Sequence, residues 1–157
     1  MTLDELQEIA VSLENTPLAV RRLAEGLNEE QLRRKPPGGE FSVLENICHL
    51  RDIEEEGYAV RIQKILVEDR PLLVDLDGAQ MAAERDYNSE ELKAALDAFA
   101  SAREANVRTI QGLVPEQLTR TGAFENTGAI TLGRLLEMMR EHDDIHIDEL
   151  KKLRAKF

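Results

Sequence analysis

Residues 131–154 read TLGRLLEMMREHDDIHIDELKKLR, and this stretch decides both the fold and the candidate site. Its apolar residues recur mostly at intervals of three and four, which is the period of a helix with one buried face. Thr131 precedes the first of them and can cap such a helix. We therefore predict a long helix from Thr131 whose apolar positions are Leu132, Leu135, Leu136, Met138, Met139, Ile145, Leu150 and Leu153.

Three further segments show the helical rhythm, and no stretch shows the sustained alternation of a half-buried strand. The first two begin with a Thr or Ser three residues before a Glu, which is capping-box spacing. Pro17 is expected to break or bend the first segment. We predict helices from Thr2 to Gly26, from Ser42 to about Val67, and from Asn88 or Ser89 to about Leu113.

A link of about twenty residues, 68–87, separates the second and third predicted helices. A link this long can run the whole length of a bundle, so the two helices it joins can be parallel. The predicted fold class is all-α, a four-helix bundle with one crossover, in a single domain over residues 1–157. We expect apolar residues of the crossover to cover one side of the bundle: Leu72, Leu73, Val74 and Leu76.

A short internal echo links the two halves of the chain. Residues 27–32 read LNEEQL and residues 113–118 read LVPEQL. Each stands between the end of one predicted helix and the start of the next. The echo suggests two helix–loop–helix units.

The charge balance excludes several classes of partner. The chain has 20 Lys and Arg against 31 Asp and Glu, a formal net charge of -11. Nucleic-acid binding draws on clustered basic residues, as does contact with anionic lipid, so neither is expected. No segment approaches the roughly 18 apolar residues of a membrane helix, and the N-terminus lacks a signal-peptide pattern. We expect a cytoplasmic protein without membrane contact.

The candidate chemistry lies with the chain's three histidines, since its single cysteine excludes a Cys-rich metal site. His142 and His146 are four residues apart, so they share the apolar face of the last predicted helix. Burying two adjacent imidazoles without partners is costly, and a divalent metal would satisfy both. The alternative is a pair of hydrogen-bonded core histidines.

His49 is the third candidate and lies about two turns into the second predicted helix. If that helix neighbours the last one, His49 completes a three-His set. Three protein ligands leave positions open for water or substrate, which is typical of catalytic metal sites. Cys48 is turned about 100° away along the helix and is predicted to be a core residue.

Other polar residues surround these histidines. A metal-bound histidine usually donates its other N–H to a carboxylate or carbonyl. Arg103 can bind an anionic group of a substrate or serve the structure, and the run 54–56 is expected to be a solvated acidic face. The candidate partners for the outer N–H groups are Glu45, Asn46, Asp52, Glu56, Glu141, Asp143 and Asp144.

Taken together, the segments resemble the DinB-like superfamily, also called YfiT-like metal proteins. The resemblance implies an up-down-down-up bundle with a divalent metal held by His49, His142 and His146. Zinc or nickel would suit such a site, with iron or copper as alternatives. The segments that carry it are, in order, FSVLENICHLRDIE (41–54), RPLLVDLDG (70–78), RDYN (85–88), the stretch 99–103, TLGRLL (131–136) and HDDIH (142–146).

The resemblance also implies an activity. It points to a metal-dependent enzyme acting on a small molecule, either an S-transferase that uses a low-molecular-weight thiol such as bacillithiol or mycothiol, or a related isomerase. A hydrolase is the alternative within the enzyme class, and no residue stands out as a separate catalytic base. Family members are often dimers, so a homodimer is expected. The competing hypothesis is a non-catalytic, stress-associated metal-binding protein that acts through a partner surface.

Overall fold

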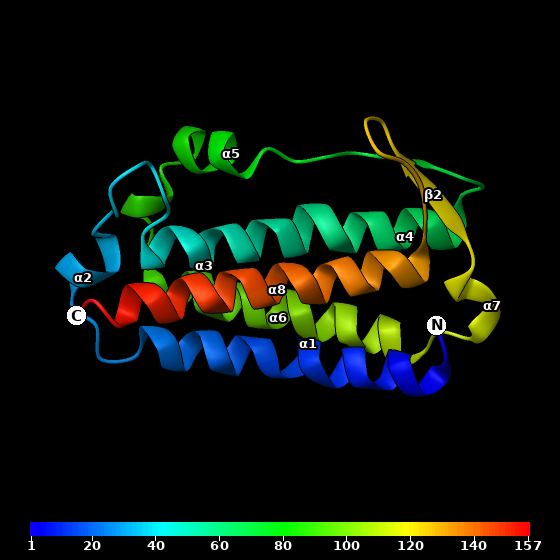
Figure 1. The fold of residues 1–157 in the computed structure, drawn as a ribbon, viewed down its shortest axis with the longest axis horizontal. Coiled ribbons are helices and arrows are strands. Elements are labelled where there is room, and N and C mark those ends of the chain that lie inside the picture. The colour runs from blue at the N-terminus through cyan, green and yellow to red at the C-terminus, as the bar shows by residue number, and fades with distance from the viewer.

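The computed structural model describes residues 1–157, and four long helical segments pack together in it (Figure 1). This confirms the all-α four-helix bundle and the approximate place of each long helix. The segments are α1 (Leu3–Ala24), α3 (Val43–Asp52) continued by the π-helical turn η1 (Ile53–Tyr58) and α4 (Ala59–Val67), α6 (Leu92–Gln111), and α8 (Leu132–Arg154). None of these helices is long and apolar enough to cross a membrane.

The helices start where local hydrogen bonds favour it. The side chains of Thr2 and Ser42 accept hydrogen bonds from the backbone three residues on, and both predicted capping boxes are confirmed. The start of α6 differs from the prediction. Tyr87–Ser89 form a separate 3₁₀ turn, η2, and Glu91 caps the helix at Leu92.

Of the two predicted effects of Pro17, a break or a bend, the break is wrong, because α1 continues through this residue. Proline has no N–H to donate to the carbonyl four residues earlier, which here belongs to Leu13. Instead, Arg103 Nη1 donates to the Leu13 carbonyl oxygen at 2.9 Å. A side chain of another helix thus satisfies the acceptor that Pro17 leaves free.

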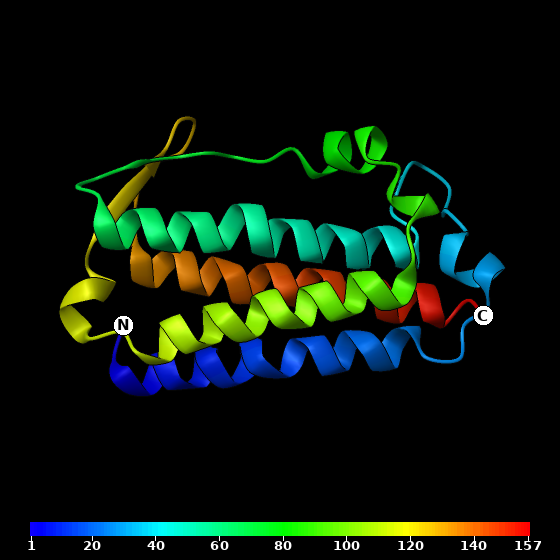
Figure 2. The ribbon, with the colours of Figure 1, turned by 180° about the vertical axis from the view of Figure 1, so that it is seen from behind.

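The crossover gives the bundle its up-down-down-up topology. Figure 2 shows α1 and α8 running in one direction and the rod of α3 and α4 running with α6 in the other. The connection between α4 and α6 returns along the outside of the bundle, so these two helices are parallel as predicted. Within it lie the strand β1 (Leu72–Leu73) and the helix α5 (Gly78–Glu84).

Polar contacts fasten the crossover to the bundle at both ends. Arg61 of α4 donates to the carbonyl oxygen of Val74 through Nε and Nη2, at 3.1 and 2.9 Å. At the other end, Arg85 and the Tyr87 hydroxyl both donate to the carboxylate of Asp52 on α3. The predicted apolar cover is half correct: Leu73 is buried and Leu76 partly so, whereas Leu72 and Val74 are exposed.

A small sheet closes one end of the bundle and was not predicted. Strand β2 (Thr121–Phe124) pairs in parallel with β1 and antiparallel with β3 (Gly128–Thr131). Strands of two to four residues are too short to show alternation in the sequence. The internal echo corresponds to two short helices, α2 (Glu29–Arg33) and α7 (Pro115–Leu118), at opposite ends of the bundle (Figure 1).

A buried ion cluster joins the four long helical segments. Arg103 of α6 is only 2% exposed and binds the carboxylate of Glu54 on η1 at 2.8 and 2.9 Å. It also binds the carboxylate of Asp143 on α8 at 2.6 and 2.9 Å. Thr16 of α1 donates to the same Asp143 carboxylate at 2.6 Å.

This cluster corrects two expectations. Glu54 does not share an acidic surface with its neighbours, since it is 1% exposed. The wider π-helical turn changes the direction of successive side chains, so a regular helical count places Glu54 wrongly. Arg103 does not bind an anionic substrate group, because two buried carboxylates and the Leu13 carbonyl oxygen occupy its donors.

We expect Arg103→Met to lower the free energy of unfolding by about 3–5 kcal/mol, because it leaves two carboxylates buried without their cation. Urea unfolding followed by circular dichroism measures the loss. The matched control is Arg108→Met on the same helix, where the side chain is 72% exposed and its ion pair contributes about 0.5 kcal/mol or less. Equal effects of the two substitutions would contradict the structural role of the cluster.

Candidate metal centre

Three histidine side chains converge between α3 and α8. His49 comes from α3, and His142 and His146 come from successive turns of α8. One ring nitrogen of each lies within 4.8 Å of the others, and the Nε2 atoms of His49 and His142 are 3.0 Å apart. His49 and His146 are each 8% exposed, and His142 is partly buried. The three predicted ligands therefore meet in one place.

The three imidazoles are neutral at neutral pH. Burial lowers the pKa of His49 from 6.5 to about 4, with proximity to His146 adding to the effect. Burial also lowers the pKa of His146 to about 4, against the opposing charge of Asp143. The pKa of His142 falls to about 2, through burial first and then the other two histidines. A neutral imidazole has a nitrogen lone pair, which is what a metal ion requires.

The donor set fits a small divalent cation. Zinc–nitrogen bonds of about 2.0–2.1 Å in a tetrahedron place ligand nitrogens about 3.4 Å from one another. The Nε2 atoms of His49 and His142 are 3.0 Å apart, near that spacing, and one nitrogen of His146 lies within 4.8 Å of both ligand atoms. No Asp, Glu or Cys ligand atom joins the group, so coordination positions would stay open. Cys48 is a buried core residue whose pKa burial raises to about 12, and its thiol lies 3.8 Å from the Tyr87 carbonyl oxygen.

Hydrogen bonds fix the orientation of His146. Its Nδ1 lies 2.7 Å from Asn46 Oδ1 and 3.1 Å from a carboxylate oxygen of Glu149. Asn46 Nδ2 donates to the Ser42 carbonyl oxygen, so the amide presents its oxygen to the ring. Both oxygens can only accept, so Nδ1 carries the hydrogen and Nε2 keeps the lone pair.

The outer partners were only partly anticipated. Asn46 was a candidate because of its place beside His49, but it contacts His146 on the facing helix. Asp143 binds Arg103 and Glu141 binds Arg134, so neither orients a histidine. Glu149 was not among the candidates, although its place three residues after His146 puts it on the same face. On the second helix, Glu45, Asp52 and Glu56 bind other groups.

A glycine of the crossover packs directly against His49. A Cβ atom at Gly78 would lie 2.5 Å from His49 Cε1 and 2.8 Å from Nδ1. Gly78 does not have a positive φ, so close approach and not backbone conformation calls for glycine here. The ring cannot retreat easily, because the centroid of Phe41 lies 5.4 Å away and that of His146 4.6 Å away. The crossover therefore packs against the His49 ring and helps to hold this candidate ligand in place.

Fold and site together define a helical bundle with a candidate metal centre between two of its helices. The chain belongs to the DinB superfamily, whose profile matches residues 12–150. The resemblance noted from the sequence is thereby confirmed.

Two relatives extend the comparison. One, from Oceanobacillus iheyensis, carries the name "Putative metal-dependent hydrolase" and is 23% identical over 141 residues, which is 90% of this chain and 81% of the relative. The other is YfiT from Bacillus subtilis, whose structure is described as that of "a probable metal-dependent hydrolase with an unusual four-helix bundle topology". It superimposes with a TM-score of 0.93 at 19% identity, covering 99% of this chain and 89% of YfiT. This second likeness establishes the fold.

We expect Gly78→Ala to weaken zinc binding by about 10–100-fold, the range seen when the support of a metal ligand is disturbed. The added methyl group would push the His49 ring out of the cluster. Titration with zinc against a competing chelator measures the change. Gly112→Ala is the control, since a Cβ there meets nothing closer than 3.6 Å. Unchanged zinc affinity in Gly78→Ala would show that His49 need not stay where the structure places it.

The metal-free protein should lose stability as the pH falls from about 6.5 toward 5. The folded-state pKa values of the three histidines lie below 6.5, so the unfolded chain binds more protons in this window. Each histidine should contribute about 1–2 kcal/mol to the loss between pH 7 and pH 5. Urea unfolding at several pH values tests this. A triple His→Gln variant should show a flatter profile, and an equally steep one would rule out the histidines as the cause.

Proposed function

We propose that His49, His142 and His146 bind one divalent metal ion and that the protein is a metal-dependent hydrolase of a small molecule. The observation that carries the proposal is the convergence of three neutral imidazoles with no fourth protein ligand. A set of three is typical of catalytic sites, whereas structural sites are closed by four. The names of the two relatives support the same class of activity.

The chain's own residues would prepare the centre. Asn46 and Glu149 hold the N–H of His146 and so direct its lone pair inward. The ion pair of Asp143 with Arg103 fixes α8 beside His142, and Gly78 leaves room for the His49 ring. A metal ion bound there supplies a Lewis acid that lowers the pKa of a coordinated water or thiol.

Thiol transfer is the alternative reaction that we propose for the same metal centre. An open coordination position accepts a thiol as readily as a water, and the family resemblance favours a low-molecular-weight thiol such as bacillithiol or mycothiol as cosubstrate. We propose zinc or nickel as the metal, because three imidazoles suit both. The homodimer and the cytoplasmic location stay predictions. A non-catalytic metal-binding protein is the competing outcome.

Metal analysis of protein prepared without a polyhistidine tag tests the ligand assignment. We expect His142→Ala and His146→Ala each to weaken zinc affinity by more than about 100-fold, because loss of an outer partner alone costs about 10–100-fold. Asn46→Ala should fall in that lower range. Glu55→Gln is the control, since Glu55 is exposed on η1 and should leave affinity unchanged. Stoichiometric metal in a His142→Ala/His146→Ala double variant would refute the assignment.

An activity screen then separates the chemical classes. Ester and amide hydrolysis is measured with the zinc and nickel forms, and thiol transfer is measured with bacillithiol, mycothiol and glutathione. Activity that chelation removes and metal restores would support the enzyme. Tight metal binding without activity in either screen would favour the non-catalytic alternative.

A further inference from the structure

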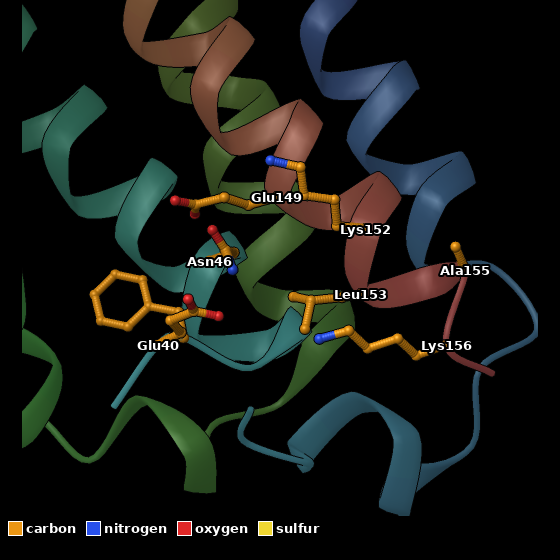
Figure 3. A pocket seen from close by; sticks show the side chains of 8 residues that line it. Glu40, Asn46, Glu149, Lys152, Leu153, Ala155 and Lys156 are labelled. Atoms are coloured by element: carbon orange, nitrogen blue, oxygen red, sulfur yellow. The ribbon is translucent and has the colours of Figure 1, made fainter. Parts of the chain in front are cut away.

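A cavity of about 590 Å³ opens at the end of the bundle, between the C-terminal turns of α8 and the entrance to α3. Figure 3 shows its lining side chains, with Lys152 coming from α8, Lys156 from the turn after it, and Glu40 and Asn46 from the approach to α3 and its first turn. The cavity and the histidine cluster share two residues. Asn46 and Glu149 line the cavity and also contact His146 Nδ1. A molecule in the cavity would therefore lie one side chain away from the candidate metal centre.

Charges of both signs line this cavity, and no ion pair within 4.0 Å joins them to one another. Lys152, Lys156 and Glu40 take part in none of the chain's ion pairs, and the only partner of Glu149 is His146. Of the chain's other lysines, Lys35, Lys93 and Lys151 each have a carboxylate within 4.0 Å, whereas Lys64 donates only to the Leu72 carbonyl oxygen. Side chains that face one cavity and leave their charges unpaired are available to a ligand.

The two signs limit the chemistry of that ligand. A purely anionic molecule would meet the carboxylates of Glu40 and Glu149, and a purely cationic one would meet the two lysines. A zwitterion satisfies both sets with charge-assisted hydrogen bonds. Phe41 and Leu153 line the same cavity and offer apolar contact to a short alkyl chain.

We propose that this cavity binds a zwitterionic group of the α-amino-acid type. Lys152 and Lys156 would hold its carboxylate, and Glu40 and Glu149 its ammonium group. The role of the cavity as a substrate subsite beside the metal rests on the proposed function. The proposal that the cavity binds such a group rests only on the side chains that line it.

Three matched ligands test the proposal: L-norleucine carries both charges, hexanoate lacks the ammonium group, and pentylamine lacks the carboxylate. Each is titrated into metal-free and zinc-loaded protein, and nuclear magnetic resonance follows the Asn46 side-chain amide and the Leu153 methyl groups. We expect norleucine to bind about tenfold or more tightly than either other ligand, since each omits one charged hydrogen-bonding group. Equal affinities, or no shifts at these residues, would overturn the proposal.

Variants locate the binding site. Lys152→Gln/Lys156→Gln should weaken norleucine and hexanoate by about tenfold and leave pentylamine unchanged. Glu40→Gln should weaken norleucine and pentylamine instead. Lys151→Gln is the matched control, because Lys151 lies on the same turn but does not line the cavity. Binding that needs zinc and ignores Lys152→Gln/Lys156→Gln would mean simple chelation and would overturn the proposal.

The metal content of the same samples keeps the two proposals apart. Norleucine binding in the cavity of a protein that takes up neither zinc nor nickel would sustain the site and refute the proposed function. A protein that binds zinc but whose cavity does not bind norleucine would overturn the cavity site and leave the proposed function standing.

Discussion

One buried guanidinium group holds the architecture together. Arg103 reaches the carboxylates of Glu54 and Asp143 and the free carbonyl of Leu13, so a single side chain touches three other helical segments. Removing so many charges from water is costly, and only near-complete hydrogen bonding offsets that cost. The helices must therefore meet in one register. Because Asp143 directly follows His142, the same register fixes where the candidate metal ligands lie.

The second determinant of the site is the crossover, which crosses most of the bundle before α6 begins. It brings Gly78 against His49 and is held at its ends by Arg61 and Asp52. The histidines thus depend on a segment that contributes no ligand. Support of this kind is typical of metal sites, where the surrounding shell orients the ligands.

Much of the fold and of the candidate metal site could be predicted from the sequence. Helical periodicity located the four long segments, and the spacing of His142 and His146 placed both on a buried face. What escaped prediction depends on contacts between distant residues or on local departures from ideal geometry. Glu54 turns inward because of the π-helical turn, α1 passes Pro17 because Arg103 takes the free carbonyl, and Asn46 contacts His146 because α3 faces α8. None of these has a periodic signal. The strands of the small sheet are simply too short to show one.

The positions of the chain ends affect where a purification tag can be attached. Figure 1 shows the N-terminus at one end of the bundle and the C-terminus at the other. Phe157 directly follows Lys156, which lines the cavity beside the histidines. A purification tag fused after Phe157 would hang over that cavity, and a run of tag histidines there would compete for metal. The same tag fused before Met1 would start at the opposite end of the bundle, where Met1 packs beside Gly133 at the start of α8.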